Sequence, residues 1–263
     1  MDDTLADVAF LSRSGHRVGI LRTLAAGPRD REALRAATGA SDPTVGRILG
    51  DFESRGWVRR RGHEYVVTGP GAFVADRFAS LLDQLAAERR LRDVWRWLPA
   101  ELDGFALELV ADAEVTVVEP GDPYGPANRC ASLYRETDSL RAVDAALTAP
   151  HHFAELYGQV AEGTTADVVL PAAVSRTIAE TYPERAAEVL ASGNLSLWLH
   201  DDLPLYRLLV FDDRVGIGGY DPDSGVLQAF VDTAAPDARA WVVSTIEALI
   251  EAARPLDPDG RSA

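Results

Sequence analysis

The chain has 263 residues, of which 47% are apolar, and a formal net charge of −15. This length allows one large or two ordinary domains, and the apolar fraction is typical of a globular protein and excludes a disordered one. All 26 basic residues are arginine, and lysine is absent. A lysine-free, acidic composition indicates a surface adapted to concentrated salt, because acidic side chains keep it hydrated. A high-GC genome would also replace lysine by arginine, but it would not explain the excess of acids.

The charges are unevenly divided along the chain. Residues 1–97 hold 16 Arg against 13 Asp and Glu, whereas the remaining 166 residues hold 10 Arg against 28 acids. A mildly basic N-terminal part on an acidic body predicts contact with nucleic acid through the N-terminal part.

Three features predict a cytoplasmic protein. The single Cys130 cannot form an internal disulfide, which fits a reducing compartment. The acidic start Met1-Asp2-Asp3 is unlike a signal peptide. No run approaches the roughly 18 apolar residues of a membrane span, so no membrane partner is expected.

Residues 1–69 predict four helices and a β-hairpin. Apolar residues at helical spacing and capping residues place the helices at Leu5–Leu11, His16–Ala26, Asp30–Ala37 and residues 42–55. Ser41 or Asp42 caps the last of these, Pro43 occupies its first turn, and Gly56 ends it. Two short strands, Trp57-Val58 and Tyr65–Val67, flank a basic turn at residues 59–63. This order is that of a winged helix-turn-helix.

Side chains for DNA binding are predicted on two of these elements. The helix at 42–55 would lie in the major groove, where Arg47 can bind guanine and Thr44 a base edge or a thymine methyl. Ser41 and Asp42 stand at its N-terminus, which suits a phosphate. The hairpin would follow the minor groove or its backbone through Arg59, Arg60, Arg61 and His63. Arg13, Arg17 and Arg35 are further phosphate candidates; the alternative for each arginine is plain solvation.

A long helix over residues 72–97 is expected next, after a hinge at Gly69-Pro70-Gly71. Val74, Phe78, Leu81 and Leu85 form a short heptad-like stripe on it. We therefore interpret residues 70–98 as a linker helix that pairs two copies of the chain; packing within one chain is the alternative.

Residues 99–254 predict an α/β domain, and residues 255–263 a disordered tail, so that the fold class of the whole chain is α+β or α/β. The expected strands are 115–118, 140–143, 166–170, 195–199, 206–211, 214–219 and 227–231. The expected helices are 128–135, capped by Asn128, 151–162, 172–191, bent near Pro183, and 235–253.

Two stretches resemble known families. Ser41–Val58 (SDPTVGRILGDFESRGWV) resembles the recognition helix and following strand of archaeal winged-helix regulators of the arsenical-repressor-like superfamily. The stretch LPLY at 203–206, DDRVG at 212–216, Tyr220-Asp221 and residues 238–253 are similar to the effector domain of archaeal methanogenesis and filament regulators. The second resemblance implies a small-molecule sensor with the fold of one half of a phospholipase D-like domain. A lysine-free chain cannot carry the His-x-Lys pattern of true phospholipases, so the resemblance implies a sensor or dimer module and no enzyme.

A sensor pocket needs an apolar bowl with a few polar anchors. The candidate anchors are Arg129, Tyr134, Arg135, His152, Arg207 and Tyr220. Pairing with nearby carboxylates is the alternative for the arginines. The adjacent His151 and His152 and the His200-Asp201-Asp202 stretch lack the spacing of a metal site. No phosphate-binding loop or hydrolase nucleophile pattern is present, and neither catalytic residues nor a cofactor nor a metal is expected.

Together these features predict a sequence-specific DNA-binding transcriptional regulator. Its expected partners are double-stranded DNA, a small-molecule effector and a second copy of the chain. Two other classes remain open: a winged-helix module that binds protein, and an enzyme with a winged-helix appendage.

Overall fold

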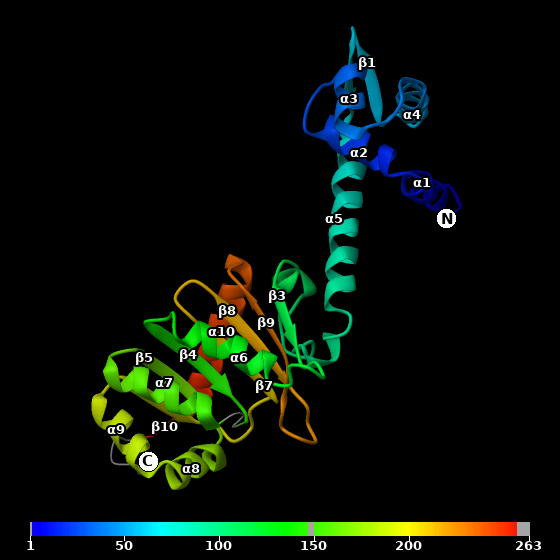
Figure 1. Ribbon diagram of the computed structural model, residues 1–263. Coiled ribbons are helices and arrows are strands. Elements are labelled where there is room, and N and C mark those ends of the chain that lie inside the picture. Colours follow the sequence, from blue (N-terminus) through cyan, green and yellow to red (C-terminus); the bar gives the residue numbers. More distant parts are fainter. Residues whose placement is uncertain (1, 147–149, 257–263) are drawn as a thin grey trace. The chain divides into compact units, whose positions relative to one another are not determined.

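The computed structural model describes residues 2–146 and 150–256, and the side chains of residues 3–146 and 156–256 (Figure 1). The chain divides into two compact units, Met1–Ala86 and Ala87–Ala263, and each is described by itself.

The N-terminal unit has the predicted order of elements. Its helices and strands are α1 (Asp2–Ser12), α2 (Gly15–Ala25), α3 (Arg31–Thr38), α4 (Asp42–Ser54), β1 (Val58–Arg61), β2 (Glu64–Val67) and the first part of α5 (Gly69–Leu91). Asp30 begins α3, since its carboxylate accepts a hydrogen bond from the backbone N–H of Ala33 at 2.8 Å. Gly39 ends α3 in the left-handed conformation, with φ of 67°.

The core of this unit forms because α2, α3 and α4 each bury one apolar face. Ile20, Leu24 and Leu34 are fully buried, as are Val45 and Ile48 on α4. Edge-to-face packing of Phe10 with Phe52 and with Trp57 joins α1 and the start of the hairpin to this core. The N–H and C=O of Arg29 both bond to Tyr65, so this residue extends the two-stranded hairpin by one bridge.

The structure corrects the hairpin in one respect. Arg59, Arg60 and Arg61 lie on strand β1 and not in the turn, which consists of Gly62 and His63. Gly62 has φ of 65°, a left-handed conformation that glycine adopts without strain.

The structure also corrects the long helix at both of its ends. The predicted hinge is the first turn of α5, where Thr68 Oγ1 accepts a hydrogen bond from Gly71 N at 3.2 Å. A Cβ at Gly71 would lie 2.0 Å from the carbonyl oxygen of Trp57, so this glycine serves close packing and not flexibility. The helix ends at Leu91 and not near residue 97, because a turn and the short 3-10 helix η1 (Trp95–Trp97) let Leu91, Val94 and Leu98 all be buried.

The described residues of the C-terminal unit form one mixed sheet of eight strands in the order β10-β6-β5-β4-β7-β8-β9-β3. The strands are β3 (Glu114–Val117), β4 (Ser139–Asp144), β5 (Thr165–Leu170), β6 (Leu195–Leu199), β7 (Tyr206–Val210), β8 (Val215–Tyr220), β9 (Leu227–Thr233) and β10 (Arg254–Pro255). Strands β4, β5 and β6 are parallel, and the other pairs are antiparallel. The protein is therefore of the mixed α+β class.

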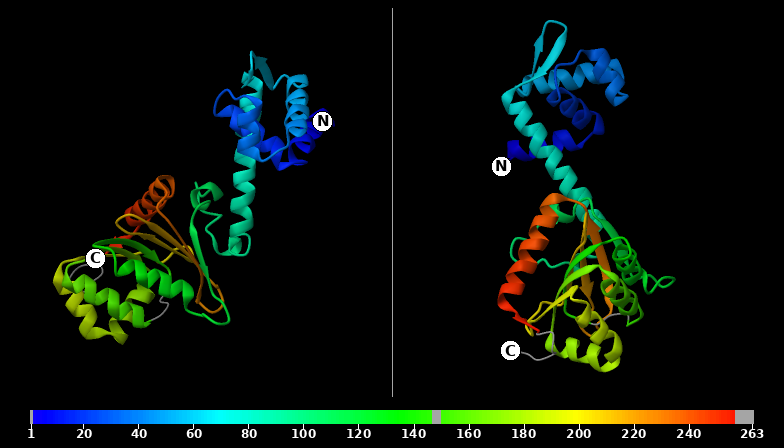
Figure 2. Two further views of the ribbon diagram at one scale, coloured as in Figure 1. Left: turned by 45° about the horizontal axis from the view of Figure 1, so that its top comes forward. Right: turned by 90° about the vertical axis from the view of Figure 1, so that its left-hand side faces the viewer.

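Helices cover both faces of this sheet (Figures 1 and 2). They are α6 (Gly125–Tyr134), α7 (Pro150–Glu162), α8 (Ala172–Thr181) and α9 (Pro183–Ser192) on one face and α10 (Pro236–Ala252) on the other; a short 3-10 helix, η2 (Leu107–Val110), was not predicted. Strand alternation divides the apolar residues between two cores. Ala142 and Ala166 face the core beneath α6, α7 and α9, whereas Val143 and Val169 face the core that contains α10.

Three further expectations need correction. Helix α6 begins at Gly125 with Pro126 in its first turn, so Asn128 is not its cap. Residues 172–191 form two helices instead of one bent helix, because Pro183 starts a new one. The expected tail begins in an ordered segment: Arg254 and Pro255 pair with β6, and Leu256 N donates to Leu197 O at 2.8 Å. Residues 257–263 lie outside the described residues.

Candidate nucleic-acid interface and ligand cavity

The start of α4 presents three of the predicted DNA-binding residues. Ser41 precedes the helix but caps no backbone N–H; its Oγ lies 2.9 Å from Thr44 Oγ1 instead. Asp42 occupies the exposed first turn, where a carboxylate complements the helix dipole. Thr44 is half-buried, so a contact from its hydroxyl would have to replace the bond to Ser41.

Arg47 points away from the core of the unit. Its side chain is 61% exposed, whereas Val45 and Ile48 beside it are fully buried. Arg47 Nη1 lies 3.8 Å from Asp51 Oδ2, one turn further along α4. An exposed pair at this distance contributes about 0–1 kcal/mol, so it holds the guanidinium only weakly.

A further arginine that sequence reasoning missed lies against α4. A Cβ built at Gly46 would meet Arg31 Nη2 at 3.2 Å, which places the Arg31 guanidinium over this helix. Arg31 is the first residue of α3, whereas Arg47 belongs to α4 itself. Two positive charges from different helices therefore lie on α4. The signal in the sequence was the glycine in the middle of a helix, which often marks a close approach.

The three arginines of β1 do not share one face, because successive side chains of a strand point to opposite sides. Arg59 and Arg61 lie on one side of the hairpin. Arg60 lies on the other side and pairs across the strands with the buried Tyr65. Arg60 Nε donates to Gly62 O at 3.0 Å, and Arg61 pairs with Glu64 at 3.6 Å. All three are exposed, as is His63.

Arg17 is part of the core, in contrast to the predicted phosphate contact. Its side chain is buried, Nη1 donates to Phe10 O at 2.7 Å, and the guanidinium lies 4.0 Å from the centre of the Phe10 ring. Burial, together with the nearby charge of Arg47, lowers the pKa of Arg17. It holds α1 against α2, whereas Arg13 and Arg35 are exposed as expected.

A buried polar cluster lies where β4, β7 and β8 adjoin. Asp144 Oδ2 accepts from Arg207 Nε at 3.0 Å, and its Oδ1 accepts from the hydroxyl of Tyr220. Burial by itself would lower the pKa of Arg207, but the charge of Asp144 raises it well above the ordinary value. The guanidinium also reaches Cys130, with Nη1 3.6 Å from Sγ. These groups satisfy one another, which a buried charge requires.

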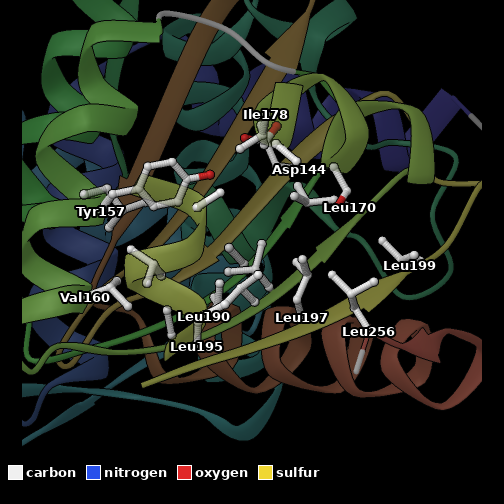
Figure 3. A pocket seen from close by; sticks show the side chains of 18 of the residues that line it. Asp144, Tyr157, Val160, Leu170, Ile178, Leu190, Leu195, Leu197, Leu199 and Leu256 are labelled. Atoms are coloured by element: carbon white, nitrogen blue, oxygen red, sulfur yellow. The ribbon is translucent and has the colours of Figure 1, made fainter. Parts of the chain in front are cut away.

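A cavity of about 420 Å³ lies between the sheet and the helices α7, α8 and α9 (Figure 3). Its volume falls in the range of roughly 300–1,000 Å³ that small-molecule sites occupy. Most of the lining is aliphatic, and the Asp144–Arg207 pair and Tyr134 form part of the wall. The hydroxyl of Tyr157 points into it, and burial raises the pKa of Tyr157 to about 12, so the phenol stays neutral at ordinary pH.

Only some of the predicted effector anchors lie at the cavity. Tyr134 and Arg207 line the cavity, and Tyr220 contacts Asp144 behind it. Arg129 lies elsewhere, where Nε donates to the fully buried Asp232 at 2.9 Å. Arg135 is exposed beyond α6, and the side chain of His152 lies outside the described ones. Sequence reasoning missed Asp144 and Tyr157, because one acid among 41 and one tyrosine on a helix carry no local signal.

Cys130 provides a direct check on how tightly this region is packed. It is the only cysteine and is buried, and burial raises the pKa of its thiol. Because the thiolate is the reactive form, we expect the native protein to react with a disulfide reagent such as DTNB far more slowly than the protein in denaturant. The absorbance of the released thiolate measures both rates, and equally rapid labelling would contradict this packing.

Within residues 2–146 and 150–256, no helix combines the length and hydropathy needed to cross a membrane. In the same residues, no three His, Cys, Asp or Glu side chains gather as a metal site.

The chain thus consists of two compact units, the first with exposed arginines on α4 and β1 and the second with a ligand-sized cavity. Residues 5–90 match the family model of the HVO_A0261 N-terminal domain, and residues 123–252 match that of the middle domain of the methanogenesis regulatory protein FilR1. These two matches together support a protein of the transcription-regulator type. No curated protein matches the chain.

Several solved structures are similar to the chain. TrmBL2, an archaeal chromatin protein, is 13% identical, with 94% of this chain and 97% of the other covered and a TM-score of 0.43. The phospholipase D family member Nuc from Salmonella typhimurium is 15% identical over 54% of this chain and 96% of its own, with a TM-score of 0.41. The homodimeric winged helix-turn-helix domain of Mb0332 from Mycobacterium bovis is 33% identical over 34% of this chain and 84% of its own, with a TM-score of 0.28.

Proposed function

We propose that the chain is a sequence-specific DNA-binding transcriptional regulator whose N-terminal unit is a winged helix-turn-helix. The observation that carries this proposal is the exposure of Arg47 on α4 and of Arg59 and Arg61 on β1. The unit that holds them matches the HVO_A0261 N-terminal domain, and residues 123–252 match the FilR1 middle domain. Helix α4 enters the major groove, and the β1–β2 hairpin lies on the minor groove. The function is binding and not catalysis, which fits a chain that has no lysine for a His-x-Lys pattern.

Retardation of DNA tests this function. We expect the full chain to bind the DNA fragment upstream of its own gene more tightly than a scrambled fragment of equal length and composition. A module that binds only protein would retard neither fragment specifically, and that result would reject the proposal.

The salt dependence of binding tests how the arginines act. Counterion release makes log K fall with log salt by about 0.9 per neutralised phosphate, so six contacts would lose on the order of 10⁵ in affinity per tenfold rise in salt. Residues 1–97 contain only three more arginines than acidic residues. We therefore expect directional hydrogen bonds to dominate and binding to persist at about 2 M KCl, with a slope much shallower than the roughly −5 to −6 that six phosphate contacts would give. A slope near −6 with no binding at that salt would contradict this mechanism.

The second element of the proposal is a homodimer that pairs through α5. Within the predicted stripe, Val74 and Phe78 pack against the core of the N-terminal unit, whereas Leu81 and Leu85 are 44% and 49% exposed. They are four residues apart and therefore adjacent on one face of the helix. A two-fold pair of recognition helices would match the two half-sites that such regulators commonly bind.

Replacing both exposed leucines tests this pairing. The variant Leu81→Glu/Leu85→Glu is expected to weaken self-association at least about tenfold, because four carboxylates would meet at the interface. Sedimentation equilibrium measures the dimer constant, and Ala86→Glu, exposed on another side of α5, serves as the control. Equal association of all three proteins would place the dimer elsewhere.

The third element is a small-molecule effector in the C-terminal unit. The cavity next to Asp144 and Arg207 is the site that supports it, since two of the predicted anchors line it.

A further inference from the structure

Most of the residues that line the cavity in the C-terminal unit are aliphatic. On β6, Leu195, Leu197 and Leu199 alternate toward it, and Ala166, Val168 and Leu170 do so on β5 (Figure 3). Helices α7, α8 and α9 close the opposite side, with Val160, Ile178, Val189 and Leu190 among the lining residues. An occupant that buries its body here must be apolar, because a hydroxyl-rich molecule would lose hydrogen bonds to water without replacing them.

The charges inside the cavity cancel. Asp144 and Arg207 carry opposite charges and bond to each other, and the phenol of Tyr157 is neutral. A charged group of the ligand at this end would disturb a buried ion pair, so the interior favours a neutral, apolar segment.

The rim of the cavity has a different character. Arg176 on α8 lines it and is exposed, and in the described part of the chain no carboxylate forms an ion pair with it. Arg254 on β10 lines it as well and pairs with Asp201 at 3.6 Å. Two arginines therefore lie at the mouth of an apolar cavity, and among the described residues Arg176 has no carboxylate in an ion pair, although the chain holds 41 acids for 26 arginines.

We propose that this cavity binds an amphipathic carboxylic acid, with its hydrocarbon body between the sheet and α7–α9 and its carboxylate at Arg176 and Arg254. A guanidinium suits this head group, because it can donate two parallel hydrogen bonds to a carboxylate. The inference deepens the sensing element of the proposed function by naming the class of its ligand. A neutral hydrocarbon would leave the rim arginines unused, and a cationic amphiphile would meet them with like charge.

Calorimetric titration of the full chain without DNA tests the proposal, with decanoate, decanol and decylamine as probes at a KCl concentration that keeps the protein folded. We expect decanoate to bind about tenfold more tightly than decanol, and decylamine to bind least. Arg176→Gln should remove that preference while leaving decanol binding unchanged. Arg185→Gln, which alters an exposed arginine of α9 outside the lining, should behave as the unaltered protein does.

Filling the cavity tests the location. Val168→Phe is expected to abolish binding of all three probes while the thermal midpoint of unfolding stays equal or rises; if that variant does not fold, Ala186→Leu fills the helical side instead. Decanoate binding that survives a folded filling variant would overturn the site, and equal affinity for decanoate and decanol would overturn the carboxylate. Failure of DNA retardation with intact decanoate binding would reject the DNA-binding function alone, and the converse would reject the ligand alone.

Discussion

Replacing Asp144 with alanine is expected to destabilise the C-terminal unit by about 3–5 kcal/mol. The substitution leaves the buried guanidinium of Arg207 without its carboxylate and removes the acceptor of the Tyr220 hydroxyl. Urea unfolding of the full chain followed by tryptophan fluorescence measures the change. Four of the five tryptophans, Trp95, Trp97, Trp198 and Trp241, belong to this unit, so the signal reports mainly on it.

Two variants separate the buried pair from an ordinary ion pair. Asp167→Ala breaks the half-exposed contact with Arg141 at 3.7 Å and should cost about 0–1 kcal/mol. The double change Asp144→Leu with Arg207→Met removes both charges and should recover most of the loss, because no unpaired charge then remains. A loss no larger than that of the Asp167 variant would mean that the cluster contributes little.

Replacing Arg47 with alanine is expected to weaken binding to the preferred DNA by about 1–3 kcal/mol. The variant should also lose the preference for one base over the others at the position that Arg47 contacts. An arginine that reads a base carries specificity, whereas one that contacts phosphate carries affinity for every sequence alike. Arg59→Ala should therefore weaken preferred and scrambled DNA by the same factor. Fluorescence anisotropy on both fragments measures the two effects.

Arg22→Ala is the matched control for Arg47, since it removes an exposed arginine from the last turn of α2. It should change neither affinity nor preference. If Arg47→Ala weakened the binding of both DNA fragments equally, Arg47 would contact phosphate and not a base. If neither Arg47→Ala nor Arg59→Ala changed DNA binding, neither residue would lie in the DNA interface.

Local signals in the sequence predicted the order of the N-terminal elements. Capping by Asp30, the stop at Gly39 and the apolar faces of α2 and α4 act over a few residues, and the structure contains each of them. The hinge prediction failed at Gly71, because its glycine is required by Trp57 in three dimensions and not by a turn. The failure for Arg17 is similar: its partner Phe10 lies on another helix.

In the C-terminal unit, most strands could be placed from their apolar runs, but their pairing could not. The sheet brings Asp144 next to Arg207, 63 positions away, and the cavity depends on that pairing. Tyr134 and Arg207 were proposed as polar anchors for a ligand, and both line the cavity. Arg129 was proposed in the same way but pairs with Asp232, because the sequence does not show which acid lies nearby in space.

The first turn of α5 also determines how the hairpin is held. Thr68 Oγ1 donates to Gly56 O at 2.6 Å, Gly71 lies directly against the Trp57 carbonyl, and Trp57 leads into β1. These contacts tie the start of the helix to the start of the hairpin. The direction in which Arg59 and Arg61 point therefore depends on the orientation of α5 as well as on β1.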